Sequence, residues 1–257
     1  MFPFLRAVRD IRRARHDLAV LVSSQWRIAA ALALARVPTR IGRQRRRNRH
    51  WLTTALPPED RSRPVVSELA GIARTLGAEP PSEYRLDAAP LASRRASLQS
   101  ALGTRPPVAL HAFAGSRARC VAVSEWRVLA ESLVRRGRAV LWIGARPELD
   151  EIRAGGVSPH WYFADVIGDG SLRDAIALLT LCTALVGHDS GPMHIASALG
   201  VPVVGIFAPG EPRRTFPQGP GPARVIARPS PVGITAGVIL RELDELLTQP
   251  SPTIARR

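Results

Sequence analysis

Residues 184–207 read ALVGHDSGPMHIASALGVPVVGIF, and this stretch decides the fold. Within it, Ala184 to Val186 and Val203 to Phe207 are short apolar runs of the kind that form buried strands. Between them, Gly191 to Leu199 has the spacing of a helix and is followed by Gly200, a common helix stop. The stretch therefore predicts a strand, a helix and a second strand in direct succession.

The same alternation continues on the N-terminal side of this stretch. Further strands are expected at 108–112 and 139–143, and further helices at 124–136 and 171–182. Short apolar strands that alternate with helices of about 10 to 15 residues indicate a parallel sheet with helices on both faces. We therefore expect residues 91–257 to form a Rossmann-like α/β lobe whose ligands lie beyond the carboxyl ends of its strands.

Residues 1–90 are predicted to form a separate N-terminal lobe. An apolar run at 17–22 predicts a strand, and residues 26–36 and 67–76 have helical spacing. Residues 40–63 are polar and basic without a period that would bury one face, so they are predicted to be a surface loop. Residues 77–90 contain prolines and no apolar run, which favours a linker between the two lobes.

The basic residues of this 257-residue chain are all arginine, and they are unevenly distributed. There are 36 of them, the net charge is +15, and fifteen lie in the first 63 residues. Such a field attracts nucleic acid, anionic lipid or a phosphorylated substrate, and charge alone does not choose between them. Nucleic acid ranks a distant third, because Trp51 is the only aromatic residue near the run RQRRRNRH at 43–50.

The cysteines and the N-terminus point to a cytoplasmic protein. Cys120 and Cys182 belong to no CxxC or Cys/His cluster, so neither a disulfide framework nor a zinc site is expected. The apolar start before Arg6 is too short for a signal peptide, and the apolar stretch 18–37 is interrupted by charged residues. We predict no metal ion and no membrane span.

Two loops at carboxyl ends of expected strands have suitable chemistry for a nucleotide. In residues 111–119, Gly115 and Ser116 allow close backbone approach and Arg117 and Arg119 supply positive charge, which suits a diphosphate. A plain solvent loop explains these residues almost equally well. Glu148 follows the strand at 139–143 and can accept the two hydroxyls of a ribose, although a carboxylate in a first helical turn is a slightly better explanation.

The third loop, residues 187–194, gives the most specific signal. Gly191 opens a helix whose backbone N–H groups can bind an anion, while Asp189, Ser190 and His194 offer an acceptor, a hydroxyl and an imidazole. The alternative is a helix capped by Asp or Ser, and capping is compatible with ligand binding. His188 and His194 do not have the four-residue spacing of paired metal ligands on a helix.

The sequence from Leu185 to Pro209 resembles the motif of glycosyltransferase family 9, the ADP-heptose:lipopolysaccharide heptosyltransferases. The pattern D-[ST]-G-x-x-H-x-A-x-A-L-G-x-P is matched in full at 189–202. Upstream, residues 165–172 are similar to the family's D-L-x-G-x-x-S-L. The resemblance implies a GT-B fold of two Rossmann-like lobes with parallel sheets. The family's opening strand and Gly-Asp turn have no counterpart before Met1, so the N-terminal lobe is expected to be incomplete.

The resemblance also implies the residues that bind the donor. Asp189, Ser190, Gly191 and His194 would hold its diphosphate and sugar, with Gly115 and Ser116 in the loop beneath. Arg119 falls where the family has a diphosphate-binding Lys. Glu148 is the candidate for the ribose and Gly170 for the wall beside the adenine. The acidic residue expected to act as the base has no counterpart in this chain, and the catalytic residue is left unassigned.

The implied activity is transfer of a heptose or similar sugar from an ADP-sugar to a lipopolysaccharide inner-core acceptor or other glycolipid. The ADP-sugar is a substrate, and no cofactor is expected. The basic N-terminal part would then contact the anionic surface of the inner membrane peripherally. The alternative is a catalytically impaired module that binds a sugar nucleotide or an acidic glycolipid, which the incomplete N-terminal lobe would explain.

Overall fold

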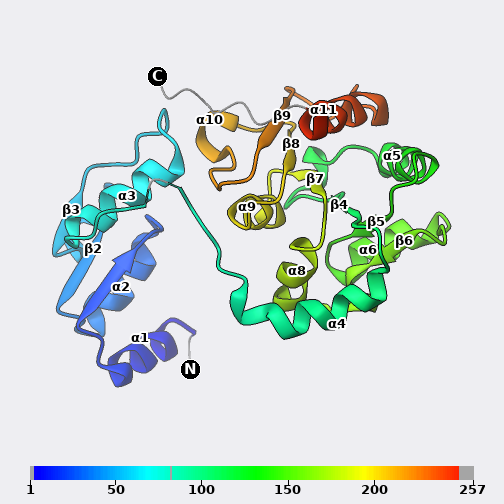
Figure 1. The fold of residues 1–257 in the computed structure, drawn as a ribbon. Coiled ribbons are helices and arrows are strands. Elements are labelled where there is room, and N and C mark those ends of the chain that lie inside the picture. Colours follow the sequence, from blue (N-terminus) through cyan, green and yellow to red (C-terminus); the bar gives the residue numbers. More distant parts are fainter. Residues whose placement is uncertain (1–2, 82, 249–257) are drawn as a thin grey trace. The chain divides into compact units, whose positions relative to one another are not determined.

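The computed structural model describes residues 3–81 and 83–248, and the chain divides into two compact units, Met1–Pro81 and Ser82–Arg257 (Figure 1). This division lies earlier in the chain than the predicted boundary after residue 90. The reason is a pair of backbone hydrogen bonds: Tyr84 N–H donates to Gln218 O at 3.2 Å, and Leu86 N–H donates to Ala198 O at 2.9 Å. The end of the predicted linker is therefore attached to the second unit.

The first unit is built on a parallel sheet of three strands in the order β1-β2-β3. Its strands are β1 (Leu18–Leu21), β2 (Thr39–Arg43) and β3 (Thr54–Leu56), and its helices are α1 (Pro3–Ala14), α2 (Trp26–Leu34) and α3 (Val65–Thr75). The strand predicted at 17–22 and the helices predicted at 26–36 and 67–76 are confirmed. Helix α1 was not predicted, and it has no buried residue.

The prediction that residues 40–63 form a surface loop is wrong. Strands β2 and β3 lie within or overlap this segment and pair in parallel, with Ile41 opposite Thr54. Arg40 is tolerated on β2 because its guanidinium donates hydrogen bonds to backbone carbonyl oxygens of Val37, Pro38 and Trp51, the last at 2.7 Å. Arginines that bind the backbone in this way hide the strand, because the sequence shows only their charge.

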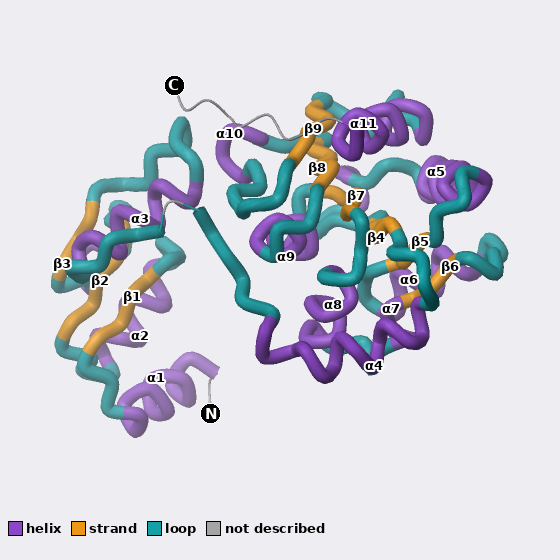
Figure 2. The backbone as a smooth tube through the Cα atoms, viewed as in Figure 1, coloured by secondary structure: helices purple, strands orange, loops and turns teal. Residues whose placement is uncertain are grey.

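The second unit contains a six-stranded sheet in the order β6-β5-β4-β7-β8-β9, and every pairing is parallel (Figure 2). The strands are β4 (Val108–His111), β5 (Val140–Trp142), β6 (Trp161–Phe163), β7 (Ala184–His188), β8 (Val203–Phe207) and β9 (Ala223–Ala227). The four predicted strands of this unit are confirmed, whereas β6 and β9 were not predicted. The order places β4 and β7 side by side at the centre of the sheet.

Helices cover both faces of this sheet, as the alternation predicted. They are α4 (Ala92–Leu102), α5 (Val123–Arg135), α6 (Arg146–Ala154), α7 (Ala164–Ile167), α8 (Leu172–Leu179), α9 (Gly191–Ala198), α10 (Pro212–Thr215) and α11 (Ala236–Thr248). Val108 of β4 packs in one buried cluster with Trp126 of α5 and Ile239 of α11. The next residue, Ala109, packs in the other cluster with Leu178 of α8. Successive strand residues thus alternate between two apolar cores.

Within the described ranges, no helix is both long enough and apolar enough to cross a membrane.

Candidate functional site

Three loops meet at the carboxyl edge of the second sheet, after β4, β7 and β8. Arg119 ends a short 3₁₀ turn (Arg117–Arg119) in the first loop, and its Nη2 lies 3.3 Å from Oδ2 of Asp189, which follows β7. The Nε of the same guanidinium donates to the carbonyl oxygen of Pro209, after β8, at 3.0 Å. One arginine thus joins all three loops, and the β8 loop belongs to the site although the sequence did not give it a role.

The Asp189 carboxylate is the centre of this arrangement, and only 16% of its side chain is exposed. Thr215 Oγ1 donates to Oδ2 at 3.2 Å, and Nε2 of His194 lies 3.7 Å from Oδ1. Burial alone would raise the pKa of Asp189, but the contacts with His194 and Thr215 and the charge of Arg119 outweigh it and hold the pKa below its ordinary value. We call Arg119, Asp189, His194 and Thr215 the carboxyl-edge cluster.

Thr215 is a member of this cluster that the sequence did not reveal. It lies in α10, a single turn that follows β8 and carries no motif. Its hydroxyl donates to the carboxylate that the motif at 189–202 supplies. The usable signal was positional: segments that follow parallel strands gather at one edge of the sheet.

The helix α9 begins at this edge with an accessible N-terminus. Ser190 occupies the N-cap position, yet its side chain makes no cap hydrogen bond. Instead its hydroxyl donates to His188 O at 2.9 Å and lies 3.2 Å from Nδ1 of His111. A Cβ at Gly191 would meet nothing within 4 Å. The capping role considered for Ser190 is therefore wrong, and backbone N–H groups of the first turn remain for an anion.

His188, the last residue of β7, connects this strand to the loop that follows β4. It is fully buried, its Nε2 accepts a hydrogen bond from Val121 N–H at 3.0 Å, and its ring lies 5.4 Å from that of Trp126. Burial lowers the pKa of His188 to about 4, and the neighbouring His111 adds to the effect. The neutral imidazole thus accepts a hydrogen bond that joins two loops. The sequence analysis considered His188 only as a possible metal ligand and gave it no structural role.

We expect acid to destabilise the protein through His188. The pKa is about 4 in the folded state against 6.5 ordinarily, so the neutral ring contributes fully above pH 6.5. As the pH falls from 6.5 to 4, the unfolded chain takes up the proton first, and the free energy of unfolding decreases by up to about 3 kcal/mol. Urea unfolding at several pH values, for wild type and for His188→Asn, measures this. An equal pH dependence in both proteins would contradict it.

The remaining residues of the first loop have different orientations. A Cβ at Gly115 would meet nothing within 4 Å, and the carbonyl of Ser116, an exposed residue, accepts from Arg119 N–H at 3.0 Å. Arg117, also expected to face the diphosphate, pairs with Glu151 of α6 instead, with Nη1 3.0 Å from Oε1. Of the two arginines in this loop, Arg119 alone takes part in the carboxyl-edge cluster.

Glu148 lies after β5 but is folded back on its own helix. Its Oε2 accepts the backbone N–H of Ala145, at the N-cap of α6, at 2.8 Å. A Cβ at Gly144 would lie only 2.9 Å from the same oxygen. This geometry fits the first-turn carboxylate that the sequence slightly favoured, and contact with a ribose stays a prediction.

Gly170 lies in a turn between α7 and α8 that an ion pair between the buried Asp174 and the more exposed Arg94 holds in place. Its φ of +76° is in the region that favours glycine. Asp174, 2% exposed, accepts from Asp169 N–H at 2.8 Å and from two nitrogens of Arg94 at 2.7 and 2.5 Å. Its hydrogen bonds with Arg94 lower the pKa of Asp174 to about 2. The predicted role of Gly170 beside an adenine stays a prediction.

No group of three or more His, Cys, Asp or Glu side chains suited to a metal ion occurs among the residues that the structure describes.

Comparison with known proteins shows which family the chain resembles. Curated relatives include lipooligosaccharide heptosyltransferase 2 of Haemophilus influenzae, 37% identical over 93 residues that cover 35% of this chain and 27% of the relative. Lipopolysaccharide heptosyltransferase 2 of Escherichia coli is 30% identical over 142 residues, covering 47% and 40%. The matched part of the chain therefore spans less than half the length of these curated relatives.

Solved structures share the fold. A family 9 glycosyltransferase of Veillonella parvula superposes with a TM-score of 0.79 at 16% identity, covering 96% of this chain and 79% of the other. ADP-heptose lipopolysaccharide heptosyltransferase II of E. coli gives 0.75 at 21%, covering 95% and 80%. The fold is thus of the GT-B type, as the resemblance implied. Residues 4–228 match the family model described as glycosyltransferase family 9 (heptosyltransferase). The chain belongs to glycosyltransferase family 9.

Proposed function

We propose that the chain binds an ADP-sugar at the carboxyl edge of the six-stranded sheet and transfers its sugar, a heptose or a similar one, to a lipopolysaccharide inner-core acceptor. The observation that carries this proposal is the carboxyl-edge cluster, in which Arg119 and His194 flank Asp189 beside the N-terminus of α9. Proteins similar to this chain bear the names of heptosyltransferases, which supports the choice of sugar.

The cluster provides for both parts of the donor. The diphosphate would lie between Arg119 and the first turn of α9, where a guanidinium and backbone N–H groups stabilise the charge that develops on the leaving group. The sugar hydroxyls would donate to Asp189, and His194, whose side chain is 43% exposed, is accessible to the same ligand. The ADP-sugar is a substrate, and we propose that the reaction uses no cofactor.

Arg119→Ala should weaken ADP about tenfold or more and leave adenosine within about twofold. The guanidinium acts on the diphosphate, and a hydrogen bond between charged groups contributes about 1.5–3 kcal/mol. Titration calorimetry with both ligands measures the difference. Arg117→Ala is the matched control, because that arginine is paired with Glu151 and should leave ADP affinity unchanged. An equal loss for ADP and adenosine would indicate a collapsed loop and would contradict the assignment.

The first unit is the part of the chain that we propose to contact the acceptor and the membrane surface. Helix α1 carries Arg6, Arg9, Arg12 and Arg13, and none of its residues is buried. Each arginine near an anionic surface contributes about 1 kcal/mol. We propose that this unit meets the anionic glycolipid at the inner membrane peripherally, while the enzyme stays cytoplasmic. Sedimentation with vesicles of neutral lipid, with and without anionic lipid, tests this contact, and equal binding to both would contradict it.

A second candidate is a module that binds the sugar nucleotide without transferring it. One observation favours this module: all four side chains of the carboxyl-edge cluster come from the second unit, so the proposed donor binding needs no residue of the first unit. A transfer assay with ADP-heptose and heptose-deficient lipopolysaccharide separates the two. Turnover supports the transferase, and donor binding without turnover supports the module.

A further inference from the structure

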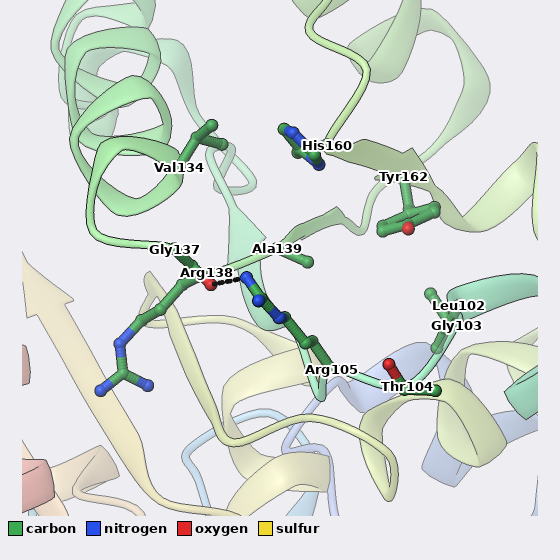
Figure 3. Close-up of a pocket in the computed structure, with 10 residues that line it drawn as sticks. All are labelled: Leu102, Gly103, Thr104, Arg105, Val134, Gly137, Arg138, Ala139, His160 and Tyr162. Atoms are coloured by element: carbon green, nitrogen blue, oxygen red, sulfur yellow. Dashed lines mark hydrogen bonds between the residues drawn. The ribbon is translucent and has the colours of Figure 1, made fainter.

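The second unit has a cavity of about 460 Å³ at the edge of the sheet opposite the carboxyl-edge cluster (Figure 3). Its lining residues come largely from the segments that lead into β4, β5 and β6, namely Leu102, Gly103, Thr104, Arg105, Val134, Gly137, Arg138, Ala139, His160 and Tyr162. Parallel strands have all their amino ends at one edge, and β4 alone separates the two edges by about 10 Å. The cavity is therefore distinct from the proposed donor site.

Each polar side chain that lines this cavity can donate a hydrogen bond. Arg105 donates one N–H to the carbonyl oxygen of Gly137 at 3.3 Å. A guanidinium has five N–H donors, so it can donate further hydrogen bonds to a ligand. Figure 3 places Arg105, Thr104, His160 and Tyr162 around the same space, whereas the Arg138 side chain runs away from them. None of the ten lining residues is Asp or Glu. A ligand that presents several acceptor atoms and negative charge complements this set.

The cavity also has an apolar part. Val134, a half-buried residue, lines it, whereas Leu102 and Ala139 are only 2% and 8% exposed and add little surface. The ring of Tyr162, half-buried, adds an aromatic surface. The volume falls within the range of small-molecule sites, which are typically apolar with a few polar groups that fix the orientation. An inorganic ion would leave this surface unused.

We propose that this cavity binds a small organic phosphate. The phosphate lies against Arg105 and His160, with the hydroxyls of Thr104 and Tyr162 in reach, and the organic part covers Val134 and the ring of Tyr162. Arginine suits this role because its planar fork matches two phosphate oxygens at once. The inference does not depend on the proposed transferase activity, since it uses none of the residues assigned to the donor.

Calorimetric titration of the full chain with phenyl phosphate tests this proposal. The probe combines a phosphate with an apolar ring, and Asp189→Ala, which impairs the proposed donor site, should bind it as tightly as wild type does. Wild type should bind it saturably, and Arg105→Ala should weaken binding about tenfold or more, because charged hydrogen bonds are lost. Arg241→Ala, which removes an equal charge from an exposed position on α11, should change it less than twofold. Phenol, which lacks the phosphate, should bind much more weakly.

Absence of saturable binding by wild type, or equal affinities in wild type and Arg105→Ala, would overturn the proposal. His160→Ala gives a second variant, expected to weaken phenyl phosphate several-fold, and thermal melting checks that both variants fold. ADP affinity, measured separately, should be unchanged in both. Loss of ADP binding with retention of phenyl phosphate binding would count against the proposed function and leave this site standing.

Discussion

Replacing Asp189 by Ala should weaken the binding of ADP-heptose about 100-fold or more without unfolding the protein. The carboxylate does two things at once: it holds Arg119 and Thr215 in position, and it is the acceptor we assign to the sugar hydroxyls. Loss of two hydrogen bonds to a charged group, each contributing about 1.5–3 kcal/mol, corresponds to this factor. No other single change in the carboxyl-edge cluster removes as many interactions.

Titration calorimetry of wild type and Asp189→Ala measures the effect, and circular dichroism verifies the fold. Glu151→Ala is a suitable control, because it removes a carboxylate that pairs with Arg117 outside the cluster. Its affinity for ADP-heptose should equal that of wild type. If Asp189→Ala binds as tightly as wild type, the donor does not occupy this edge of the sheet and the proposed site is wrong.

Replacing Arg94 by Ala should have the largest effect on stability. It leaves the buried carboxylate of Asp174 without its ion-pair partner, and although the Arg94 side chain is itself 39% exposed, a buried charge without a partner is destabilising. We expect the melting temperature to fall by at least about 5 °C at pH 7. The neighbouring Arg95, which is exposed on the same helix, supplies the control, and Arg95→Ala should melt close to wild type.

The pH dependence gives this prediction a second readout. The pKa of Asp174 is lowered to about 2, so the pair contributes fully above the ordinary value of 3.8 and is lost as the pH falls toward 2. The difference in stability between wild type and Arg94→Ala should therefore shrink in acid. A constant difference from pH 7 to pH 2 would show that Arg94 acts through packing instead of charge.

The sequence was a good guide where burial is complete. Strands such as β7 and β8 are buried on both faces, so nearly every residue is apolar and the run is visible without any structure. The motif at 189–202 likewise identified Asp189 and His194, which the structure brings together. Arg119 was found by its position in a loop at the same edge.

Elsewhere the sequence was a poor guide, because long-range contacts decide the outcome. Helix α4 buries only Leu98 and Leu102, too few for a visible period. Thr215 gains its place from a hydrogen bond to a residue far away in the chain. The acceptor role of His188 depends on a backbone N–H from another loop. A hydrogen bond across the fold leaves no trace in the local sequence.

The contacts of Arg40 bear on which substitutions the chain tolerates. Its fork binds carbonyl oxygens of Val37 and Trp51, which precede and follow β2. A lysine would conserve the charge yet offer a single ammonium on a flexible stem, which does not hold two carbonyls at fixed angles. In a protein without lysine, arginines thus fall into two classes of mutational robustness. An exposed arginine such as Arg6, which pairs with Asp10, can be exchanged for another positive charge, whereas Arg40 holds backbone carbonyls in place and a lysine there would not preserve those contacts.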